Sequence, residues 1–158
     1  IADLGGGGSS TGLVARYHLT ADLTLANSAF TVFDATVQDY DPGADVTTGA
    51  GWVYTVPTVT GTVWYDVRLE FAFLISDGNA WQDNKSAEAD VFVNGSAVAA
   101  IRIERTQARD GTGVFLDMGG SLSVPCVTGD TIQVKIFNGS GAQRKMEADS
   151  AISIYRVT

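Results

Sequence analysis

Hydrophobic and polar residues alternate along most of the chain, and this pattern is typical of β-strands with one buried face. The clearest case is residues 63–75, where every second residue is large and apolar. The positions between them include Asp66, Arg68 and Glu70. An amphipathic helix would instead place its apolar residues three and four positions apart. The segment therefore predicts one long strand with a solvated face.

Shorter alternating segments predict further strands, separated by turn residues. These segments cover residues 13–19, 30–40, 52–56, 89–93, 98–104, 114–124, 132–136 and 152–157. Asn-Gly is the strongest two-residue hairpin signal, and it occurs at residues 94–95 and 138–139. No segment predicts a helix longer than a turn or two. The pattern as a whole predicts an all-β sandwich of eight to ten antiparallel strands.

The first twelve residues have a composition different from the rest. Residues 5–8 are four consecutive glycines, and Ser, Thr and another Gly follow. Such a stretch has no side chains to pack, so residues 1–12 are predicted to be a flexible linker. A phosphate-binding loop would need a lysine after its glycines, and none is present. Residues 13–158 are predicted to form a single domain, with the linker joining it to a preceding segment.

Composition and charge exclude several classes of partner. The apolar fraction of 45% is that of a folded globular protein, while the net charge of −8 disfavours nucleic acid. No apolar run approaches the ~20 residues that span a bilayer, so membrane insertion is not expected. The single cysteine, Cys126, cannot form an internal disulfide, and its apolar neighbours predict a small buried side chain.

The residue inventory argues against an enzyme. His18 is the only histidine and no Gly-x-Ser-x-Gly motif is present, so no serine has an evident general base. Two carboxylates could meet in space and serve a glycosidase, although most acids sit at turns or on solvated strand faces. Neither a catalytic site nor a cofactor is predicted. Asp39, Asp41 and Asp45 surround a turn and leave a cation site open, but Asp41 before proline is also ordinary turn chemistry.

A polar loop at residues 77–86 contains a tryptophan, which is unusual because Trp side chains bury a large area. The ring could fold back over the sandwich or enter a subunit contact. It could also be a stacking platform for a sugar or a binding hot spot for a receptor. On the second interpretation, the predicted binding residues are Asn79, Trp81, Asn84 and Lys85.

The order of several short motifs resembles that of the C1q/tumour-necrosis-factor jelly-roll superfamily. Residues 51–57 and 61–67 resemble its aromatic–Thr–x–Pro and Gly–x–Tyr strands, and residues 92–95 resemble its central hairpin. Residues 122–134 resemble the family's strand with a leucine followed by Gly-Asp-x-Val. Residues 150–157 resemble its last strand. The resemblance spans about residues 30–157.

This resemblance implies a jelly roll that assembles as a homotrimer at the tip of a stalk or fibre and binds a ligand. The Gly/Ser linker and the Thr-, Val-, Ala- and Gly-rich composition look like a bacteriophage virion protein. The prediction is therefore a trimeric, non-catalytic tip or decoration domain on the virion surface, which binds a host-surface glycan or protein, or a neighbouring virion protein. The alternatives are a secreted carbohydrate-binding module or accessory domain of a glycoside hydrolase, and a cytokine-type signalling ligand.

Overall fold

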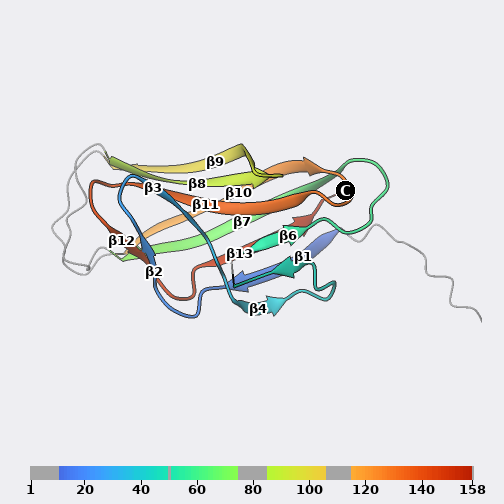
Figure 1. Cartoon of the computed structure of the whole chain (residues 1–158), viewed down its shortest axis with the longest axis horizontal. Coiled ribbons are helices and arrows are strands. Elements are labelled where there is room, and N and C mark those ends of the chain that lie inside the picture. The colour runs from blue at the N-terminus through green and yellow to red at the C-terminus, as the bar shows by residue number, and fades with distance from the viewer. Residues whose placement is uncertain (1–10, 50, 75–84, 106–114, 158) are drawn as a thin grey trace, which may run out of the picture.

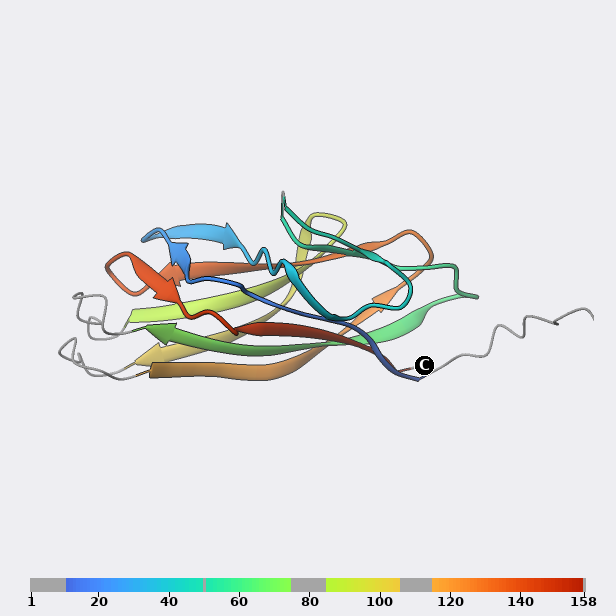
Figure 2. The same cartoon turned by 90° about the horizontal axis from the view of Figure 1, so that it is seen from below.

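The strands lie in two antiparallel sheets that pack face to face (Figures 1 and 2). The computed structural model describes residues 11–49, 51–74, 85–105 and 115–157. Within these ranges it contains thirteen strands. None of these residues belongs to a helix that is long and apolar enough to cross a membrane. The predicted linker at residues 1–12 lies, up to residue 10, outside the described residues.

The larger sheet has seven strands and is organised around β7. One edge of β7 pairs with β10 along its whole length, and the other edge pairs first with β13 and then with β12. From there the sheet continues through β1 to β4 on one side and to β2 on the other. These strands are β1 (Gly12–His18), β2 (Leu23–Leu25), β4 (Val37–Tyr40), β7 (Val63–Leu74), β10 (Phe115–Cys126), β12 (Arg144–Met146) and β13 (Ala151–Arg156).

The smaller sheet has six strands and is organised in the same way around β11. One edge of β11 pairs with β8 and then β9, while the other pairs with β6 near its start and β3 near its end. The strands are β3 (Ala29–Val32), β5 (Val46–Thr47), β6 (Val53–Thr55), β8 (Lys85–Val93), β9 (Ser96–Arg105) and β11 (Thr131–Gly139).

The core lies between the inner faces of the two sheets. Every second residue of β7 and of β11 is buried, which confirms the alternation predicted from the sequence. Aromatic rings from both layers meet there, and the centroids of Phe33 and Phe71 are 4.6 Å apart. Burying each such side chain contributes about 1.5–3 kcal/mol. Cys126 is also buried, as predicted, and burial raises the pKa of its thiol to about 11.

One Asn-Gly prediction is confirmed and the other is wrong. Asn94 and Gly95 join β8 to β9 with φ angles of 51° and 80°, as a two-residue hairpin of this kind requires. Asn138 and Gly139 instead continue β11, because Asn138 is buried and Gly139 lies directly against the carbonyl of Ser86. A Cβ at residue 139 would approach that carbonyl oxygen to 2.9 Å, so this glycine provides space for strand pairing.

The predicted strand at residues 30–40 is also corrected. It divides into β3, which pairs with β11, and β4, which pairs with β1 in the other sheet. Phe33 and Ala35 stay buried as the chain crosses between the layers. The apolar alternation therefore continues between the end of β3 and the start of β4, where the chain belongs to neither strand. The predicted loop at 77–86 ends earlier, because β8 begins at Lys85. The short strands β2, β5 and β12 have no distinct hydrophobic pattern and were not predicted.

A buried polar network fixes the end of β11 to the neighbouring segments. The Asn138 amide donates to the carbonyls of Leu25 (3.0 Å) and Ala142 (2.9 Å), and its oxygen accepts from the Ser140 hydroxyl (2.7 Å). The same hydroxyl oxygen accepts from Nε of Arg144, which is fully buried (2.8 Å). This network holds the loop between β11 and β12 against β2.

We expect Asn138→Ala to lower the free energy of unfolding by about 2–4 kcal/mol, because the buried loop loses two hydrogen bonds donated by the Asn138 amide and one accepted by its oxygen. Asn27→Ala is the matched control, since the exposed Asn27 side chain bonds to the same loop at Gly141. It should cost less than about 1 kcal/mol. Urea unfolding of both variants measures the difference, and equal losses would contradict the role given to the buried network.

Candidate functional site: the outer face of the larger sheet

The outer face of the larger sheet carries the residues that alternate with the core residues of β7. Trp64, Arg68 and Glu70 point outward and are exposed, while Asp66 is half-buried. The neighbouring strands β10 and β13 place their own outward residues directly beside them. The face has a polar part around Arg16 and an aromatic part around Trp64.

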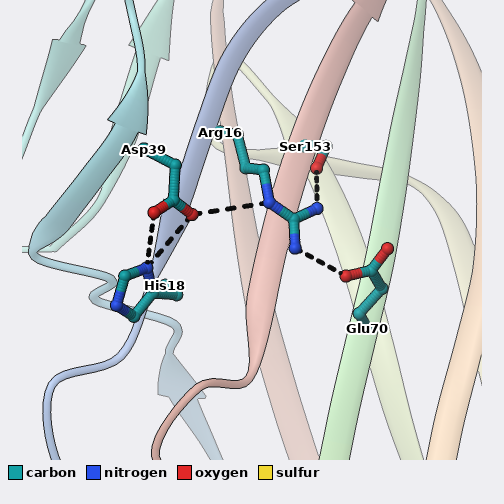
Figure 3. Close-up of polar contacts among 5 residues, drawn as sticks. All are labelled: Arg16, His18, Asp39, Glu70 and Ser153. Carbon is teal, nitrogen blue, oxygen red and sulfur yellow. Dashed lines mark hydrogen bonds and ion pairs between the residues drawn. The ribbon is translucent and has the colours of Figure 1, made fainter.

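The polar part centres on Arg16, which links four strands (Figure 3). Its guanidinium donates to Ser153 Oγ on β13 (2.9 Å) and to Glu70 Oε2 on β7 (2.8 Å). Its Nε lies 3.4 Å from a carboxylate oxygen of Asp39 on β4. His18 Nδ1 lies 3.0 Å from the other oxygen of that carboxylate. The arginine therefore ties β1 to β4, β13 and β7 on the outer surface.

His18 has the partner that orients a catalytic histidine, but the geometry of a hydrolase triad is incomplete. A triad also needs a hydroxyl within hydrogen-bond reach of the second ring nitrogen. Among the described residues, no hydrogen bond links His18 to a serine, and the nearby Ser153 accepts from Arg16. The pair of His18 and Asp39 thus belongs to the ion-pair network that connects β1 to β4.

The aromatic part lies toward the C-terminal end of β13. Trp64 is 47% exposed, and its register partner on β10 is Pro125. Val157, also exposed, donates its backbone N–H to the Trp64 carbonyl (2.9 Å). The Arg68 guanidinium carbon lies 3.9 Å from the centre of the Tyr155 ring, in a cation–π contact. An exposed tryptophan among apolar neighbours is the residue type that most often anchors a protein interface.

Small outward residues of β10 lie beside the long side chains of β7 on this face. Gly119 and Ser121 lie opposite Glu70 and Arg68 on β10, and Ser123 donates a hydrogen bond to the Asp66 carboxylate. Ser153 is covered by Arg16. Glu70 and Gly119 also line a pocket of about 390 Å³ together with residues 147–150, so the face is hollowed at this point.

Two solved structures share this arrangement of strands over nearly the whole chain. Murine APRIL matches with a TM-score of 0.59 and 13% identity, covering 94% of this chain and all of the other. The globular domain of zebrafish complement 1qA matches with a TM-score of 0.51 and 10% identity, covering 93% and 94%. The fold is that of the C1q/TNF jelly rolls. No protein-family model and no curated protein sequence matches the chain.

The comparisons confirm the predicted fold class, an all-β sandwich of the C1q/TNF type. At sequence identities of 10–13%, the similarity to these two structures shows the fold alone. The resemblance stated from short motifs is thereby supported at the level of architecture. In particular, the Gly-Trp-Val-Tyr-Thr-Val-Pro motif contains β6, and its Trp52 and Tyr54 are fully buried in the core.

The predicted binding loop stays a prediction. Asn79, Trp81 and Asn84 lie outside the described residues, and Lys85 is the first residue of β8. The outward residues of the larger sheet were not singled out from the sequence as a site. The signal that could have identified them is Trp64, a large aromatic residue at a position that the alternation assigns to the solvated face.

The three aspartates around the turn after β4 have separate roles. Asp39 pairs with Arg16 and His18, whereas Asp41 is only 5% exposed and points inward. Asp41 Oδ2 accepts from the Tyr17 hydroxyl (2.9 Å) and the Val46 amide (3.1 Å). Its Oδ1 accepts from the Asp45 amide (3.1 Å). Over the described ranges, no group of three or more His, Cys, Asp or Glu residues is placed to hold a metal.

We expect Asp41→Ala to lower the free energy of unfolding by about 2–4 kcal/mol, because the Tyr17 hydroxyl and two backbone amides lose their acceptor. Asp39→Ala, two residues away, breaks only partly exposed ion pairs and should cost less than about 1 kcal/mol. Thermal unfolding of the two variants in calcium-free buffer makes the comparison. Equal losses would show that Asp41 does not fix the turn.

The smaller sheet carries a different outer surface. Phe30 is 51% exposed and contacts the rings of Phe92 and Phe137, with centroid distances of 6.1 and 5.2 Å. The Lys135 ammonium lies 4.3 Å from the centre of the Phe92 ring. Asp90 sits beside Lys135 in the register and is 8% exposed. Burial and the neighbouring Glu88 carboxylate raise its pKa to about 6.

This raised pKa has a consequence for stability. Asp90 binds its proton more tightly in the folded chain than in the unfolded chain, where the pKa is about 3.8, so its ionisation destabilises the fold. We expect Asp90→Asn to be more stable than the wild type by about 1–3 kcal/mol at pH 7.5. The difference should vanish near pH 4. Chemical unfolding of both proteins across this range tests it, and a constant difference would contradict it.

Proposed function

We propose that the chain is a non-catalytic binding and assembly module that works as a homotrimer. The C1q/TNF-like fold supports this function, and so does the form of the outer face of the larger sheet. That face combines an exposed Trp64, small outward residues on β10 and charged groups already paired with one another. Its polar groups can be buried against a second copy at a lower desolvation cost than unpaired charges.

The single observation that carries the proposal is the exposure of Trp64 on the outer face of the larger sheet, beside Pro125 and Val157. A monomer would leave this apolar group in water. Packing three copies around an axis along the larger sheet would bury it at the centre of each contact, where interface energy concentrates. The aromatic cluster of the smaller sheet would remain on the outside, available to other partners.

The proposed setting is a virion surface. In this setting the trimer is the tip or decoration domain of a bacteriophage fibre, capsid or tail protein. It binds a host-surface glycan or protein, or a neighbouring structural protein, by shape and polar complementarity. The Gly- and Ser-rich linker at residues 1–12 supports an attachment to a longer polypeptide. Asn79, Trp81, Asn84 and Lys85 are the residues proposed to contact the host.

Light scattering coupled to size exclusion tests the assembly. The wild-type chain of 16.6 kDa should elute as a particle of about 50 kDa, three times that mass, at micromolar concentration. Trp64→Asp should raise the dissociation constant at least about 30-fold, because it places an unpaired charge at the centre of the contact. At the same concentration the variant should elute as a monomer.

Phe30→Asp is the matched control, because Phe30 is as exposed as Trp64 but lies on the outer face of the other sheet. This variant should remain trimeric. A monomeric wild type would overturn the proposal. If Phe30→Asp dissociated the trimer and Trp64→Asp did not, the interface would lie on the smaller sheet, and the proposal would be wrong.

A further inference from the structure

A pocket of about 420 Å³ opens between the two sheets at the end of the sandwich where β13 ends. Its walls come from both layers, since Tyr54 belongs to β6 of the smaller sheet and Tyr65 to β7 of the larger sheet. Arg156 of β13 is the register partner of Tyr65. The turn after β4 contributes Asp45, and Tyr40 stands half-exposed among the lining residues. The volume is within the usual range of small-molecule sites.

Three buried polar atoms at this pocket have no hydrogen-bond partner among the described residues. They are the hydroxyls of Tyr54 and Tyr65 and the Nε of Arg156. The two phenol rings are 5.7 Å apart, close enough to interact, but their hydroxyls form no hydrogen bond of normal geometry. Burial and the facing Tyr65 phenol raise the pKa of Tyr54. An unpaired buried hydroxyl costs about 1–3 kcal/mol, so grouping three such atoms at one cavity points to a missing partner.

The charges that line the pocket are balanced. Arg156 provides a cation that forms no ion pair with a described carboxylate. Asp45 provides an anion, and burial together with the nearby Asp41 raises the pKa of its carboxyl. An anionic ligand would be repelled by Asp45 and Asp41, and a cationic ligand would be repelled by Arg156. A neutral ligand that both donates and accepts hydrogen bonds meets neither penalty.

We propose that this pocket binds a neutral sugar ring, with Tyr54, Tyr65 and Arg156 donating to its oxygens and Asp45 accepting from its hydroxyls. Tyrosine and proline side chains line the pocket and provide apolar surfaces for the C–H faces of the ring. The three unpartnered atoms are shielded from bulk water, so the ligand reaches them through a small shift of the lining side chains. The site is built within one chain and is independent of the trimer proposed above.

The test uses glucose, galactose, fucose and N-acetylglucosamine as probes, with acetate and methylamine as charged controls. Two-dimensional ¹H–¹⁵N NMR follows the Arg156 Nε–H signal during titration to about 20 mM, which detects millimolar dissociation constants. We expect at least one sugar to shift this signal with saturation. Failure of all four sugars, or tighter binding of acetate or methylamine, would overturn the proposal.

Two variants separate binding from folding. Tyr54→Phe and Tyr65→Phe each remove only an unpartnered hydroxyl, so their melting temperatures should equal or exceed that of the wild type. Their affinity for the sugar should fall about threefold to tenfold, the effect of one lost hydrogen bond. Asn27→Ala, an exposed residue that lines neither the pocket nor the outer face of the larger sheet, is the control and should bind as the wild type does. Unchanged affinity in both pocket variants would refute the assignment.

Discussion

The structure depends on the strict two-residue alternation of β7 and β11, the strands at the centre of the two sheets. Because successive side chains point to opposite faces, the positions that fill the core also determine which residues face outward. A slip of one residue in β7 would move Tyr65 and Val67 into water and carry Trp64 and Arg68 into the core. The register of β7 is therefore fixed by burial, and the composition of the outer face of the larger sheet follows from it. The same alternation therefore determines both the core and the surface of each sheet.

The two outer surfaces differ in how their charged groups are paired. On the larger sheet, Arg16 joins four strands, and its charge is paired with the carboxylates of Glu70 and Asp39. On the smaller sheet, Lys135 lies over a phenylalanine ring while Asp90 stays buried beside Glu88. The first surface is suited to being covered, since its polar groups already have partners. The second contains an ionisable group whose charge the fold disfavours, which makes the stability of the fold depend on pH.

The sequence was sufficient for the architecture because alternation is a local signal. The long strand at β7, the hairpin at Asn94 and Gly95, and the buried Cys126 could all be recognised from neighbouring residues. Pairing between distant segments carries no such signal, so the division of residues 30–40 between two sheets was missed. Asn138 was misassigned for a related reason. Its side chain donates to the carbonyl of Leu25, which lies 113 positions away in the chain and which only the folded chain brings next to it. The pocket at Tyr54, Tyr65 and Arg156 was equally invisible, because it joins three strands from both layers.

The two ends of the sandwich treat buried polar groups in opposite ways, and this contrast bears on function. Around Asn138, amide and hydroxyl groups at the end of β11 satisfy one another and the adjacent carbonyls. Around Tyr65, at the end of β13, hydroxyls of the same burial have no partner. A fold that can complete a polar network at one end has no structural need to leave one open at the other, where phenylalanine would fill the same space without the desolvation cost. The open set at Tyr54 and Tyr65 is best understood as hydrogen-bonding capacity held for a ligand.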